Sequence, residues 1–107
     1  MNPQFKKGIL ELCVLCGLLD GDKYGFELVN YVSQGVDMSD GTVYPLLKRL
    51  RDNGHVTTYL VESSEGPARK YYHLTQTGAE YAQELRRDWF AFIKNIEKII
   101  GTEEVSA

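Results

Sequence analysis

The 107-residue sequence has few cysteines and no long apolar run, two features that would otherwise indicate its class of protein directly. Its two cysteines are too few for the disulfide framework of a small secreted domain. No apolar run is long enough to span a bilayer, and the N-terminus lacks the charged-then-apolar order of a signal peptide. We therefore expect a single cytoplasmic domain with no membrane partner.

Candidate catalytic and metal-binding groups are also scarce. Cys13 and Cys16 have the spacing of thiol redox sites, but they fall in the middle of an apolar segment, away from any helix N-terminus that would lower a thiol pKa. A buried structural pair is the simpler interpretation, and a redox enzyme is the alternative. His55 and His73 have no metal-ligand spacing. The sequence thus predicts no enzyme, no metal site and no cofactor.

Positive charge is in short supply as well. The net charge of −3 argues mildly against nucleic acid as a partner. Only residues 39–75 are net positive, with five Lys or Arg against four Asp or Glu, whereas both flanking segments are net negative. A local basic face is compatible with an acidic protein. The alternative is that these charges form an ordinary solvated surface.

The periodicity of apolar residues predicts the order of the elements. Helices are expected over residues 5–19, 24–32, 39–53 and 76–101, with two antiparallel strands on either side of the turn SSEGPA before the last helix. Residues 102–107 are expected to be a disordered tail. The predicted fold is α+β and mostly helical, with a winged helix-turn-helix over residues 1–75 followed by a long C-terminal dimerisation helix.

Four motifs make this pattern more specific. The sequence contains, in order, KKGILELCVLCGLL, YGFEL, SDGTVYPLLKRLRDNGHV and GPARKYYHLTQTG. This succession resembles the PadR family of bacterial transcriptional regulators, and the single helix that follows resembles its short subfamily. The resemblance implies a homodimeric DNA-binding repressor that a small molecule or a stress signal releases from double-stranded operator DNA.

The third predicted helix contains a proline, Pro45. Its inward positions are Val43, Leu46, Leu47 and Leu50. At 100° per residue, its outward positions are then Gly41, Pro45, Lys48 and Asp52, with Tyr44 at the edge. A proline in a helix interior destabilises the helix by roughly 3 kcal/mol. An outer surface shaped to press against DNA would explain why this helix tolerates that cost. The alternative is that the helix begins near Pro45.

The predicted DNA contacts come from this helix, the ribbon and the first helix. Hydroxyls near a helix N-terminus suit a phosphate, and cations suit phosphates or a guanine edge. The predicted contact residues are Ser39, Gly41, Thr42, Tyr44, Pro45, Lys48, Arg69, Lys70 and Lys6. Asp40 and Asp52 oppose this function, so the alternative is a winged-helix protein-interaction module without DNA binding.

The last predicted helix carries a heptad seam that offers more apolar surface than one small domain can cover. The residues expected at a dimer interface or ligand site are Trp89, Leu85, Phe92, Ile93, Ile96 and Ile99. Twofold symmetry would bring Trp89 near its copy and form an apolar slot for a planar aromatic effector. The alternative is that Trp89 only packs in the interface.

Overall fold

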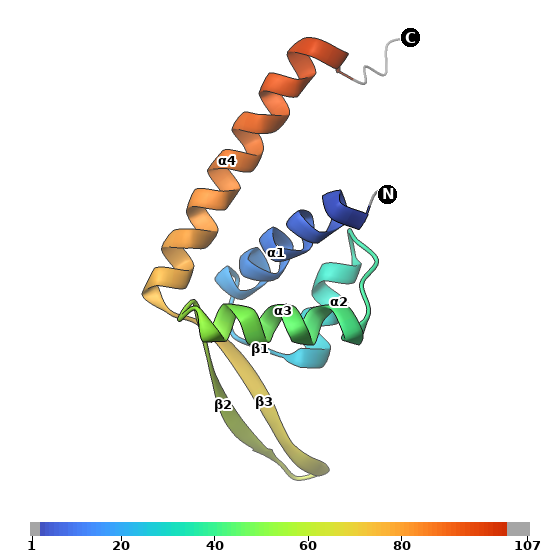
Figure 1. Ribbon diagram of the computed structural model, residues 1–107. Coiled ribbons are helices and arrows are strands. Elements are labelled where there is room, and N and C mark those ends of the chain that lie inside the picture. Colours follow the sequence, from blue (N-terminus) through green and yellow to red (C-terminus); the bar gives the residue numbers. More distant parts are fainter. Residues whose placement is uncertain (1–2, 103–107) are drawn as a thin grey trace.

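The computed structural model describes the backbone of residues 3–102 and the side chains of residues 8–102. The side chain of Lys6 and the predicted tail from residue 103 onward lie outside this description. The elements in chain order are α1 (Pro3–Leu19), β1 (Lys23–Tyr24), α2 (Gly25–Ser33), α3 (Asp40–Asp52), β2 (Val56–Ser63), β3 (Gly66–Leu74) and α4 (Gln76–Ile100). In Figure 1, the β2–β3 ribbon extends below the first three helices and α4 rises above them. The predicted winged-helix fold with a long final helix is confirmed.

The sheet has one strand more than the sequence predicted. No strand was predicted here, and Tyr24 was expected to begin the helix over residues 24–32, yet Lys23 and Tyr24 pair antiparallel with Tyr72 and Tyr71 of β3. The strand order is therefore β1-β3-β2. A strand of two residues has no alternating pattern to detect, because its pairing depends on the edge that β3 offers.

The ribbon is also longer than predicted. Strands β2 and β3 pair from Val56 opposite Leu74 to Ser63 opposite Gly66, with an irregularity just after Val61. The predicted turn over residues 63–68 thus shrinks to two residues, because antiparallel strands can close through a two-residue connection. The outer half of the ribbon extends well beyond the helices and forms the wing (Figure 1).

The hydrophobic core lies where α1, α2, α3 and the base of the sheet meet. The most deeply buried side chains are Val14, Leu15, Leu28, Val43, Leu47, Leu50 and Val56. Each fully buried aliphatic side chain contributes roughly 1.5–3 kcal/mol relative to exposure. Helix α1 contacts α2, β3 and α4, which explains why its sequence is apolar on more than one side.

The start of α4 is fixed against the end of α3. The Thr75 hydroxyl donates to the Gly54 carbonyl at 2.7 Å and accepts from the Gly78 N–H at 3.0 Å, so Thr75 caps the helix. Gly78 is buried, and a Cβ at this position would overlap the His55 carbonyl oxygen. Only glycine therefore lets α4 begin this close to the chain that leaves α3.

Candidate nucleic-acid interface

Helix α3 has one buried face and one exposed face. Its four predicted inward residues are all buried, whereas Gly41, Pro45 and Lys48 are exposed. Because the helix begins at Asp40, Pro45 lies inside it and the alternative of a helix starting near Pro45 is wrong. The outer face thus combines a residue without a side chain, a rigid ring and a cation.

The N-terminus of α3 has two exposed hydroxyls. Ser39 occupies the N-cap position, but its side chain makes no capping hydrogen bond. Its Oγ instead lies 3.3 Å from the Thr42 Oγ1, and both side chains are exposed. The first N–H groups of a helix have no acceptor within it and carry the positive end of the helix dipole, so this end suits a phosphate.

Lys48 is paired on the outer face of α3. Its Nζ donates to the Asp52 carboxylate at 2.9 Å, one helical turn further along. Both side chains are exposed, with relative exposures of 69% and 55%, so water screens the pair and makes it weak. Lys48 can therefore exchange Asp52 for a phosphate at small cost.

Arg49 faces α1 instead of the outer surface. Its guanidinium lies 3.7 Å from the Glu11 carboxylate, which also accepts from the Tyr81 hydroxyl at 3.3 Å. Burial raises the pKa of the Tyr81 hydroxyl, and the neighbouring Glu11 charge raises it further. This group of three side chains connects α1, α3 and α4.

Tyr44 is at the edge of the exposed face, as predicted, and is 42% exposed. Its phenol ring extends toward α2, where a Cβ on Gly25 would lie 3.0 Å from two of the ring carbons. Gly25 therefore leaves the space that the Tyr44 ring occupies. Tyr44 joins the outer face of α3 to the start of α2, a contact that helical periodicity alone does not predict.

The two wing cations lie on opposite faces of the ribbon, because neighbouring residues of a strand alternate. The Arg69 guanidinium lies over the ring of Tyr24, 4.8 Å from its centroid. Lys70 is opposite Leu60 and shares a face with the buried Tyr72. Both cations are exposed.

A polar cluster joins the wing to the loop before β1. The Asp22 carboxylate accepts from the Tyr59 hydroxyl at 2.7 Å, and its other oxygen lies 2.7 Å from Nδ1 of His73. These contacts, first Tyr59 and then His73, lower the pKa of Asp22 below its ordinary value of 3.8. Neither this cluster nor the role of Tyr24 was predicted from the sequence, since both depend on the pairing of β1.

Helix α4 leaves much of its apolar seam uncovered. Helix α1 covers the first turns, where Ala82 is buried. Further along, Phe92 is 51% exposed and Ile99 is 81% exposed, whereas Ile93 and Ile96 are partly exposed. The predicted excess of apolar surface is therefore present in the single chain.

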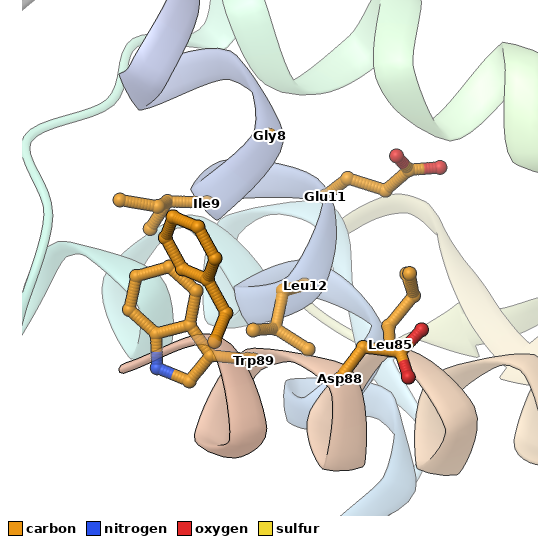
Figure 2. A pocket seen from close by; sticks show the side chains of 8 residues that line it. Gly8, Ile9, Glu11, Leu12, Leu85, Asp88 and Trp89 are labelled. Carbon is orange, nitrogen blue, oxygen red and sulfur yellow. The ribbon is translucent and has the colours of Figure 1, made fainter. Parts of the chain in front are cut away.

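A groove of about 440 Å³ separates α1 from α4. Its lining residues are Gly8, Ile9, Glu11, Leu12, Leu85, Asp88, Trp89 and Phe92. Figure 2 shows Ile9 and the Trp89 indole at one end of the groove, with the carboxylates of Glu11 and Asp88 toward the other end. The ring of Trp89 lies 6.5 Å from that of Phe92. The groove brings together Leu85, Trp89 and Phe92 of the predicted ligand set, whereas its α1 wall was not predicted.

The two thiols have the properties of structural cysteines. Cys13 and Cys16 are free and partly buried, and burial raises the pKa of both above their ordinary value of 9.0. Within residues 3–102, no cluster of three or more His, Cys, Asp or Glu side chains is arranged to hold a metal ion. No helix in the described part of the chain has the length and apolarity needed to cross a membrane.

Comparisons with known proteins agree with this geometry. Residues 14–84 match the model of the transcriptional regulator PadR-like family. The fold is similar to a PadR-like transcriptional regulator of Bacillus cereus, with a TM-score of 0.83 and 33% identity over 94% of this chain and 99% of that one. It is also similar to a Streptococcus transcriptional regulator, with a TM-score of 0.82 and 35% identity over 92% of this chain and 98% of that one.

Proposed function

Because this chain belongs to the PadR-like family of transcriptional regulators, we propose that it is a cytoplasmic homodimeric repressor whose α3 helices enter successive major grooves of an operator. The observation that carries the proposal is the exposed face of α3, where Gly41 and Pro45 leave room for a close approach and Lys48 supplies a cation. Ser39 and Thr42 supply hydroxyls to a phosphate at the N-terminus of the same helix.

The wing complements α3 in this proposal. A ribbon that enters a minor groove has a sugar-phosphate backbone on each side. Arg69 and Lys70 lie on opposite faces of the ribbon and so suit phosphates of opposite strands. Lys6, near the start of α1, is proposed to contact the flanking backbone.

The exposed seam of α4 supports dimerisation. A second copy of α4 would cover Phe92, Ile96 and Ile99, and each fully buried side chain of this type contributes roughly 1.5–3 kcal/mol. A dimer that places its α3 helices about 34 Å apart matches one turn of DNA. Sedimentation equilibrium measures this assembly directly, and Ile99→Glu should shift it toward the monomer.

The test of DNA binding is selection of bound fragments from genomic DNA, followed by titration of the selected duplex at several salt concentrations. Each phosphate contact contributes about −0.9 to the slope of log affinity against log salt. Lys48→Ala should weaken binding and leave the dimer unchanged, whereas Lys94→Ala on α4 is a matched control that should change neither. Failure to select any duplex would favour a protein-interaction module instead.

The groove beside Trp89 supports an effector site for a planar aromatic compound. Aromatic and aliphatic walls favour a flat ring, and the carboxylates of Glu11 and Asp88 favour a cation over an anion. A ligand releases the repressor only if it prefers a dimer with displaced α3 helices. Trp89 fluorescence should therefore be quenched by cationic planar aromatics, and operator DNA should oppose that quenching.

A further inference from the structure

Two adjacent residues at the junction of β1 and α2 contact both elements that are proposed to bind DNA. The ring of Tyr24 lies under the Arg69 guanidinium of the wing, 4.8 Å from centroid to Cζ. The next residue, Gly25, faces the phenol ring of Tyr44 on α3. Residues 24 and 25 therefore stand between the wing and α3.

The Tyr24 ring is itself held in place. It lies 5.5 Å from the ring of Tyr71, which is stacked 5.6 Å from the ring of Tyr59. The three tyrosines are paired across β1, β3 and β2, so they form a row on one face of the sheet. The Tyr24 N–H also donates to the Glu27 carboxylate at 3.2 Å.

The base of the junction is fixed by Lys23. Its Nζ donates to the Gly17 carbonyl at the end of α1, at 2.6 Å, and lies over the ring of Tyr31 at 4.6 Å from the centroid. Strand β1 is thus tied to the helices on one side and to β3 on the other. The Tyr24 ring consequently has a fixed position relative to α3.

We propose that Tyr24 and Gly25 are positioning residues for DNA binding. Tyr24 holds the Arg69 guanidinium in one position on the wing. Gly25 leaves room for the Tyr44 ring against the start of α2, and this contact keeps α3 at a fixed distance from that guanidinium. Pre-orienting Arg69 reduces the freedom that it would lose on binding a phosphate. This inference rests on the proposed function, since it requires Arg69 to contact DNA.

The first test compares Tyr24→Leu with Tyr24→Phe in titrations of the selected duplex over a range of salt. A cation over an aromatic ring at an exposed site corresponds to about two- to fivefold in affinity per half-site. Tyr24→Leu should weaken binding by that factor and make the salt slope shallower, as Arg69→Ala should. Tyr24→Phe retains the ring and should match the parent protein.

A double variant separates positioning from general damage. If Tyr24 acts through Arg69, then Tyr24→Leu should add little to the loss caused by Arg69→Ala. Additive losses, or an unchanged salt slope in Tyr24→Leu, would overturn the inference. Phe90→Leu is the matched control, because it removes an aromatic ring that faces a cation, Arg86, on α4 and away from the wing. Tyr24→Thr, with a residue that favours strands, replaces Tyr24→Leu if the latter fails to unfold cooperatively.

The second test addresses Gly25. A Cβ at this position would displace the Tyr44 ring, so Gly25→Ala should weaken DNA binding. Tyr44→Phe removes the phenol oxygen and should restore part of that binding in the Gly25→Ala background. No recovery would contradict the role of this contact. If the parent protein selects no duplex, the proposed function is wrong as well. If the parent protein binds tightly and Tyr24→Leu binds equally well, only the positioning role is wrong.

Discussion

Replacing Asp52 with asparagine should tighten DNA binding, because the parent protein must separate Lys48 from Asp52 to use Lys48 on a phosphate. An exposed pair one helical turn apart is worth about 0.3–0.5 kcal/mol. Over two half-sites, the binding free energy therefore improves by about 0.6–1 kcal/mol because no ion pair has to be broken. Removing the carboxylate also relieves its repulsion of nearby phosphates, which amounts to about 0.5 kcal/mol for charges about 8 Å apart in water. Together these contributions amount to about 1.1–1.5 kcal/mol, so the expected gain is about six- to thirteenfold in affinity.

The measurement is fluorescence anisotropy of a labelled operator duplex at constant salt. Parent protein, Asp52→Asn and Glu84→Gln should be compared, since Glu84→Gln removes one negative charge from an exposed position on α4. The control should bind like the parent protein. Thermal unfolding should change little, because Asp52 lies in the last turn of α3, where the helix dipole disfavours a negative charge.

A further comparison isolates the ion pair from simple repulsion. In a Lys48→Ala background, Asp52→Asn should give a smaller gain, because only the carboxylate repulsion is then relieved. Equal or weaker binding by Asp52→Asn in the parent background would refute the assignment of Lys48 to the DNA-contacting face. An equal gain in both backgrounds would show that the pair itself does not compete with DNA.

Three other perturbations test the fold and the site. Gly78→Ala should destabilise the protein by about 2–3 kcal/mol because its Cβ overlaps the His55 carbonyl, whereas Gly8→Ala, with open space around it, should be neutral or slightly stabilising in thermal unfolding. Asp22 has a lowered pKa in the folded protein, so its contribution to stability is present above pH 3.8 and is lost as the pH falls through the lower folded value. The Asp22→Asn variant should therefore be less stable than the parent protein at neutral pH. In acid, the melting curves of the variant and the parent should converge. Pro45→Ala should regain a backbone hydrogen bond and raise the melting temperature while weakening operator binding, and lower stability with unchanged binding would assign the proline a purely structural role.

The helices could be predicted from the sequence because apolar residues recur at helical spacing along them, although α1 is apolar on more than one side. The inward residues of α3 were correctly identified, and its observed range, Asp40–Asp52, lies within one residue of the predicted range 39–53 at each end. The seam of α4 was also visible, because Leu85, Trp89 and Phe92 recur at three- and four-residue intervals. Exposure of its later part follows from the length of α4, which extends past α1.

The contacts between elements could not be predicted in the same way. Strand β1 exists only because the edge of β3 is available, and the positions of Tyr24 and Asp22 depend on that pairing. The direction of the Tyr44 ring depends on the missing side chain of Gly25. Such contacts join residues that are distant in sequence, so no local period reveals them.

The attachment of α4 has a mechanical consequence. The Gly54 carbonyl accepts from the hydroxyls of both Thr75 and Thr77, so α4 starts from the residue where α3 has just ended. A helix of 25 residues is about 37 Å long at about 1.5 Å per residue. A rigid helix of this length would act as a lever arm about its attachment at Gly54. A tilt of about 5° at the pivot moves the far end by about 3 Å over such a length, so in a dimer held by α4 a small change in helix crossing would alter the separation of the two α3 helices.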